Sequence, residues 1–228
     1  CDMMSISIEA FTKARNLFDN FDKDAHKKVR ELETTVDKYE DKISTYLVKV
    51  AATQMSAKES KVVTELLHVI SDIERISDHA LSLAGTAKEV HDKQVEFSES
   101  AKKDLSIMAY AVAEILELSR KVLFDDDIET AKQVEPLEQV IDRLNRKIKA
   151  GHVTRLQHGE CTMELGFILM DMLNAYERIS DHCSNIAVCF IEISHDSFET
   201  HEYLNQVKSG NEQAFSDMYA FYKQKYYI

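Results

Sequence analysis

The chain has 228 residues, of which 44% are hydrophobic and 30% charged, so it holds enough apolar material for a folded core. Only 5 Gly and 1 Pro are present, and because β-rich folds need these residues repeatedly at turns, the composition favours long helices. The net charge of −12 disfavours nucleic acid as a partner, since phosphate backbones repel an acidic surface. No run of about 18 consecutive apolar residues occurs, so no part of the sequence is expected to span a membrane.

Apolar residues at helical spacing account for nearly the whole chain, in two successive groups of three helices. The first group is predicted over residues 3–18, 24–52 and 58–92. The second group comprises a helix over 98–124, a helix that follows Asp127, and a helix that opens at Gly159 and reaches residue 194. Pro136 is expected to kink or restart the fifth helix. Residues 209–211 then break the pattern, and 212–223 form a short closing helix.

The fold class predicted from this order is all-α, with two tandem three-helix bundles and a short C-terminal helical tail. The bundles occupy residues 1–97 and 98–195, and the tail occupies 196–228. No linker rich in Gly or Ser separates the bundles, so they are expected to pack closely. Four Cys, at positions 1, 161, 183 and 189, form no CxxC pattern, and reduced thiols are their expected state.

The hexapeptide Glu-Arg-Ile-Ser-Asp-His occurs at residues 74–79 and again at 177–182, about half the chain length apart. An identity of this length at that spacing indicates an internal duplication. Within each copy, a Glu and an Asp are spaced as ExxxD. The preceding helix of each half carries the same spacing, at 33–37 and 138–142. One ExxxD is a weak signal among 40 acidic residues, but four at matching positions of a duplicated unit indicate a shared site.

The position of these carboxylates on their helices predicts two clusters at the border of the core. At about 100° per residue, the Asp of each motif falls about 40° from its Glu, so both lie on one strip. Apolar residues such as Ile73 and Leu173 border that strip. Two antiparallel helices in each half would bring two such pairs together. The residues concerned are Glu33, Asp37, Glu74 and Asp78 in the first half and Glu138, Asp142, Glu177 and Asp181 in the second.

Carboxylates gathered beside a core need compensation, because burying each one unpaired costs on the order of several kcal/mol. A multivalent cation is one solution: oxygen ligands suit Mg, Mn or Ca, and carboxylates between helices also hold di-iron and di-manganese centres. Arginine is the other solution. Arg75 and Arg178 directly follow the Glu of each hexapeptide, and Arg30 and Arg146 lie on the polar strips. The residues alone leave both solutions open.

The doubled hexapeptide, with Asn185-Ile186-Ala187 after its second copy, resembles the signature of the PhoU family of phosphate-signalling proteins. The resemblance covers the chain to about Ser194. It implies two tandem three-helix bundles whose ExxxD motifs bind multinuclear iron or zinc at the surface of each bundle. One departure is that Ser82 stands in the first half where Asn185 stands in the second. The implied metal sites consist of Glu33, Asp37, Glu74 and Asp78, and of Glu138, Asp142, Glu177 and Asp181.

Segments 39–49, 67–79 and 201–204 show a narrower resemblance, to the PhoU-like C-terminal domain of bacterial Na⁺/phosphate cotransporters. This implies a metal-binding regulatory domain on the cytoplasmic face of the membrane, with a transporter domain preceding Cys1 as its partner. The alternative is a free-standing PhoU-type negative regulator of phosphate signalling and ABC phosphate transport. A third interpretation is a helical module whose carboxylates are paired with Arg and bind no metal. A homodimer is compatible with each of them.

No catalytic arrangement is recognisable, so the protein is predicted not to be an enzyme. Di-metal carboxylate enzymes use Glu-x-x-His on their ligand helices, and no His lies three residues after the Glu of any ExxxD motif here. A P-loop and a Gly-rich phosphate cradle are also absent from the sequence. His79 and His182 fall about 100° beyond the second Asp, outside the ligand strip.

Overall fold

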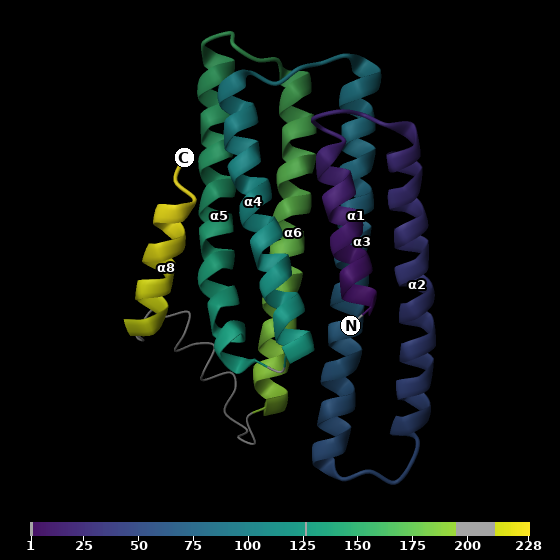
Figure 1. The fold of residues 1–228 in the computed structure, drawn as a ribbon. Helices are drawn as coiled ribbons and strands as arrows, with labels where there is room; N and C mark the ends of the chain where they lie inside the picture. Colours follow the sequence, from purple (N-terminus) through teal and green to yellow (C-terminus); the bar gives the residue numbers. More distant parts are fainter. Residues whose placement is uncertain (1, 126, 195–212) are drawn as a thin grey trace.

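The structure is a computed structural model that describes residues 2–125, 127–194 and 213–228 of the chain (Figure 1). Within these ranges all regular structure is helical, so the predicted all-α fold class is confirmed. The helices are α1 (Asp2–Asn16), α2 (Lys23–Ala51), α3 (Ala57–Lys93), α4 (Glu99–Asp125), α5 (Ile128–Gln157), α6 (Met163–Ser194) and α8 (Gln213–Lys225).

The helices form two three-helix bundles that lie side by side. Helices α1, α2 and α3 pack on one another, and so do α4, α5 and α6. The bundles meet where α3 packs against α6 and α1 against α4, with the long helices running along one common direction (Figure 1). Helix α8 packs on α5, outside the interface between the bundles. The two helices that carry the hexapeptides therefore form the centre of the molecule.

The hexapeptides supply core residues as well as carboxylates. Ile76 and Ile179, the third residues of the two copies, are completely buried. The serines that follow them, Ser77 and Ser180, are buried too. The apolar residue repeated at this position explains part of the identity between the two copies, because each Ile packs its helix against the core of its own bundle.

Side chains that precede the helices fix where several of them begin. Asp22 accepts a hydrogen bond from the Ala25 amide at the start of α2, at 2.6 Å. Ser56 and Glu59 form a reciprocal capping box at the start of α3. Asp127, the residue before α5, accepts hydrogen bonds from the Glu129 and Thr130 amides. These caps satisfy amides that have no partner within the helix.

Gly159 ends the fifth helix and does not open the sixth, which corrects the sequence prediction. Its φ of 71° lies in the left-handed region, where a residue without Cβ is favoured. The amide of Glu160 turns back to the carbonyl of Arg155 at 2.9 Å, which closes α5. Helix α6 begins later, after Thr162, whose hydroxyl accepts from the Leu165 amide. Helix α5 also runs without a restart through the buried Pro136.

The predicted domain boundaries at 97/98 and 195/196 stay a prediction. Helix α3 ends before the first of these boundaries, and helix α4 begins after it. The expected break at 209–211 and most of the predicted tail lie outside the described residues, as does Cys1. Cys161, Cys183 and Cys189 are free thiols. None of the helices in the described ranges combines the length and apolar character needed to cross a bilayer.

Candidate metal centre

In the second bundle, three of the four predicted carboxylates converge. One oxygen each from Glu138 and Asp142 of α5 and from Asp181 of α6 lie within 4.8 Å of one another, and all three residues are half-buried. The two helices can do this because the ExxxD spacing puts Glu138 and Asp142 on one face of α5, toward α6. The arrangement offers three hard oxygen donors at one point.

Glu177, the fourth predicted ligand, lies at the edge of this group and has partners of its own. Asn145 of α5 donates a hydrogen bond from its amide nitrogen to Glu177 Oε2. Lys149 Nζ lies 3.8 Å from the same oxygen. These contacts orient the Glu177 side chain between α5 and α6. Sequence reasoning did not select Asn145 or Lys149, because their role depends on which residues face α6.

The surroundings of the second cluster disfavour negative charge. Burial raises the pKa of Asp142, and the neighbouring Glu177 carboxylate raises it further. Burial and Glu177 likewise raise the pKa of Asp181, where Arg178 acts in the opposite direction. Like charges that are partly removed from water repel one another strongly. A bound cation would relieve this repulsion, so the distribution of charge at the site favours cation binding.

In the first bundle the carboxylates approach one another less closely. Glu33 and Glu74 are half-buried, whereas Asp37 and Asp78 are exposed. Among the described residues, only the α5–α6 group brings three ligand atoms together within 4.8 Å. Burial raises the pKa of Glu74 to about 7, and Asp78 contributes by its charge and by a hydrogen bond. Burial also raises the pKa of Glu33. The four residues thus influence one another without forming an equally compact group.

Arginine neutralises these clusters only slightly. Among the described residues, the one ion pair within 4.0 Å between an Arg and a predicted ligand joins Arg178 Nη1 to Asp181 Oδ2, at 3.6 Å. The Arg178 side chain is 66% exposed, so solvent screens this pair strongly. Arg30, Arg75 and Arg146 act on the neighbouring carboxylates only at longer range. The Arg residues therefore compensate the negative charge of both carboxylate clusters only weakly.

The histidines of the hexapeptides face the partner bundle. The rings of His79 and His182 stack across the α3–α6 interface, with centroids 5.6 Å apart. His182 Nδ1 lies 2.7 Å from Asp72 Oδ1, and the Asn185 amide donates to the same oxygen at 3.3 Å. Burial and, less strongly, the neighbouring His182 lower the pKa of His79 to about 4. Asp72, which sequence reasoning missed, thus links the bundles, and Asn185 belongs to this link.

A family model described as PhoU domain matches residues 1–87 and 105–189, one segment in each bundle. The chain belongs to the PhoU domain family. The two matched segments are the two copies of the duplication, so the resemblance to PhoU expected from the hexapeptides is confirmed.

Individual PhoU proteins match over most of their length. The chain is 23% identical over 217 residues to phosphate-specific transport system accessory protein PhoU homolog 1 of Thermotoga maritima, covering 94% of this chain and 91% of that protein. It is 26% identical over 162 residues to the PhoU homolog of Deinococcus radiodurans, covering 70% and 74%. The crystal structure of PhoU from Pseudomonas aeruginosa shares the fold, with a TM-score of 0.79, 20% identity, and 86% and 93% coverage.

The transporter domain expected before Cys1 is a wrong prediction. The relatives that the chain matches over most of their own length are PhoU accessory proteins, with 91% and 74% of two of them covered. The cotransporter assignment depended on short segments such as 39–49 and 67–79, which lie on α2 and α3. Both segments lie within residues 1–87, the first stretch that the PhoU domain model matches, so a PhoU domain accounts for them without a transporter.

Proposed function

We propose that this protein is a PhoU-type accessory regulator of phosphate transport, a negative regulator of phosphate signalling and of an ABC phosphate transporter. The observation that carries the proposal is the nearly end-to-end match to a phosphate-specific transport system accessory protein. The matching solved structure supports the same architecture over 86% of the chain. On this proposal the protein acts through binding and not through catalysis.

We further propose that the carboxylates between the helices hold cations, with one site in each bundle. In the second bundle Glu138, Asp142 and Asp181 are the ligands, and Glu177 completes the site from its edge. The convergence of these three residues within 4.8 Å and the raised pKa values of Asp142 and Asp181 support this. In the first bundle the ligands are Glu33, Asp37, Glu74 and Asp78.

An all-carboxylate donor set fits hard cations such as Mg, Mn, Ca or iron better than it fits soft metals. The family resemblance suggests multinuclear iron or zinc. A cation held between α5 and α6 would remove repulsion between carboxylates on different helices. Metal binding would therefore stabilise the second bundle and give its surface a metal-dependent charge, and we propose that partners recognise this surface.

Complementation tests the regulatory role. The gene is expressed in a bacterial strain that lacks its own PhoU, and phosphate uptake and the phosphate-starvation response are measured in medium rich in phosphate. We expect the wild-type chain to lower both. No change in either, despite normal protein level, would contradict the proposal.

Elemental analysis of protein purified without chelator tests the metal sites. We expect bound transition metal in the wild type and less in Asp142→Asn/Asp181→Asn. Asp171→Asn is the matched control, because Asp171 is an exposed carboxylate on the same helix α6. Wild-type protein that contains no metal, takes up none on addition and keeps its melting temperature on chelation would favour the metal-free helical module.

A further inference from the structure

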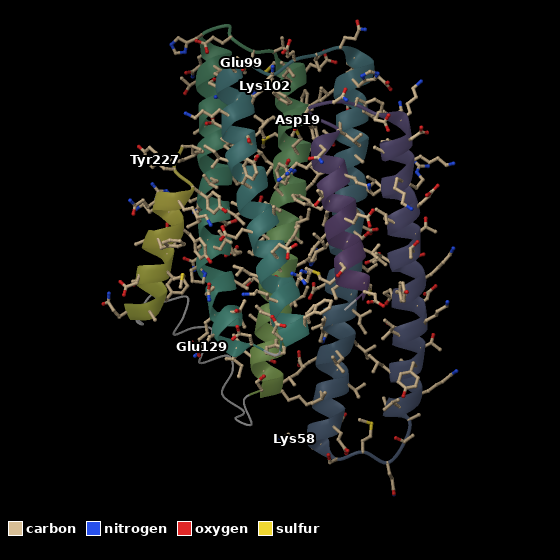
Figure 2. All side chains as sticks on the ribbon, in the orientation of Figure 1. Asp19, Lys58, Glu99, Lys102, Glu129 and Tyr227 are labelled. Atoms are coloured by element: carbon tan, nitrogen blue, oxygen red, sulfur yellow. The ribbon has the colours of Figure 1, made fainter. Side chains whose placement is uncertain are left out.

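A cavity of about 400 Å³ lies at the junction of the two bundles. Its walls come from the end of α1, the end of α3, the start of α4 and the middle of α6. Figure 2 labels Asp19, just beyond α1, and Lys102, near the start of α4, which both line it from different bundles. This volume falls within the usual range of sites for small organic ligands.

The walls of this interbundle cavity are mostly apolar and aromatic. Phe18, just beyond α1, Phe97, just before α4, Leu105 of α4 and Met172 of α6 contribute to them. Such a lining favours a ligand with an apolar body about the size of a ring system, because its burial removes apolar surface from water.

Two polar side chains in the cavity wall, Tyr176 and Arg15, can contact a ligand. The Tyr176 side chain is only 1% exposed, and its hydroxyl forms no hydrogen bond with any residue in the described part of the chain. Burial raises the pKa of Tyr176, so this hydroxyl remains a hydrogen-bond donor at neutral pH. Because Tyr176 lines the cavity, its hydroxyl is available to a ligand there.

Arg15 is the second of these groups. Its guanidinium lies over the ring of Tyr110, 5.1 Å from the centroid, and both residues line the cavity. No carboxylate among the described residues lies within 4.0 Å of it, although Asp19 is one turn away on the chain. A planar guanidinium held on an aromatic ring offers its free donors to a planar anion such as a carboxylate.

The duplication shows that packing does not require the Tyr176 hydroxyl. Tyr176 directly precedes the second hexapeptide, and Ile73 stands at the same place before the first. Ile73 is buried in its own bundle at 4% exposure, so an apolar side chain serves the scaffold there. The hydroxyl is a feature of the second copy alone, on the helix that borders the cavity.

We propose that the interbundle cavity binds a small organic anion, with an aromatic or aliphatic body between the bundles and a carboxylate that receives hydrogen bonds from Arg15 and Tyr176. The site is separate from the carboxylate clusters, and the proposal does not depend on metal binding. Because its walls come from both bundles, a bound ligand holds α1 and α3 against α4 and α6.

The test uses the full chain, treated with chelator, and a matched pair of probes. Naphthalene-2-carboxylate supplies the apolar body and the anion, and naphthalene-2-methanol supplies the same body without charge. Dissociation constants are measured by calorimetry or ligand-observed NMR. We expect the wild type to bind the carboxylate at least about tenfold more tightly than the alcohol, since a charge-assisted hydrogen bond is worth about that much.

Variants then assign the anion contact. Arg15→Gln should abolish the preference for the carboxylate, and Tyr176→Phe, which keeps the ring in the core, should weaken carboxylate binding about tenfold. Lys13→Gln is the control, because it removes a cation from the same helix outside the cavity lining. Equal affinity for both probes in the wild type, no binding of either at millimolar concentration, or carboxylate binding that Arg15→Gln leaves unchanged would each overturn the proposal.

Discussion

The α2–α3 and α5–α6 carboxylate groups share one motif and differ in the residues beside it. In the second bundle, Asn145 and Lys149 approach Glu177 from α5. Counted from the ExxxD motifs of the two halves, the equivalent residues on α2 are Glu40 and Ser44. The first group therefore has an additional carboxylate where the second has an amide donor, and a hydroxyl where the second has an ammonium.

This difference changes the electrostatics of equivalent ligands. Burial, Asp78 and, less strongly, Glu40 together raise the pKa of Glu74 to about 7. In the second bundle the Asn145 amide contacts Glu177, and the three remaining ligands converge. The duplication has thus kept the four carboxylates in both halves. The neighbouring residues decide how much negative charge each group carries and how closely its members approach one another.

The largest expected effect tests whether the two bundles are equivalent as scaffolds. Ile76→Ala and Ile179→Ala each remove a completely buried side chain from the same position of the repeat. Each should lower the free energy of unfolding by about 3 kcal/mol, through lost burial and a residual cavity. Urea denaturation followed by circular dichroism measures both. A loss in one variant and none in the other would mean that the bundles contribute unequally to the measured unfolding.

The loss of metal affinity on mutation should differ between the two groups of carboxylates. Asp142→Asn/Asp181→Asn is expected to weaken binding of Mn²⁺ at the second site about 100-fold, since it removes two converging oxygens. Asp37→Asn/Asp78→Asn should cost less, because both residues are exposed. Calorimetric titration of chelated protein with Mn²⁺ compares them, with Asp171→Asn beside them. Equal losses in the two double variants would contradict the asymmetry between the bundles.

A smaller effect is expected at the link between the bundles. Asp72 is 9% exposed and accepts from His182 and Asn185, so Asp72→Ala leaves two partly buried donors without a partner. The expected cost is about 1–2 kcal/mol of unfolding free energy. Asp171→Asn again serves as the exposed control on α6. If Asp72→Ala unfolds like the wild type, the link contributes specificity of packing and no net stability.

The smallest effect concerns pH and the first bundle alone. Because the folded-state pKa of Glu74, about 7, lies above its ordinary value of 4.5, the folded protein keeps a proton that the unfolded chain loses. Stability of the metal-free protein should therefore fall as pH rises from about 5 to about 8. Glu74→Gln should remove this component, about 1 kcal/mol after allowance for solvent screening. Denaturation of chelated protein across that range measures it.

Glu40→Gln sharpens the same comparison. It removes the carboxylate that replaces Asn145 in the first bundle, and it should reduce the pH dependence in part, since Glu40 is a smaller cause of the Glu74 shift than Asp78. Asp78→Asn should reduce it more. A pH dependence that survives Glu74→Gln unchanged would show that another group causes it.

Most helices could be predicted because their signals are local. Apolar periodicity and caps such as Ser56 with Glu59 depend on residues within a few positions of one another. The predicted start of α6 was wrong because glycine occurs both before helices and after them. Only the positive φ of Gly159 shows that it follows the end of α5. Pro136 continues α5 because its neighbours in the core are buried and hold the helix together.

The sequence by itself determined the duplication, the all-α fold and the eight carboxylates, since repeated motifs and helical spacing are visible without any partner helix. The tertiary structure alone decided which carboxylates meet. It brought Glu138, Asp142 and Asp181 together, directed His79 and His182 toward the opposite bundle, and gave Asp72 its role there. The physical reason is that convergence depends on how two helices are rotated against each other, and that rotation follows from the packing of the whole core.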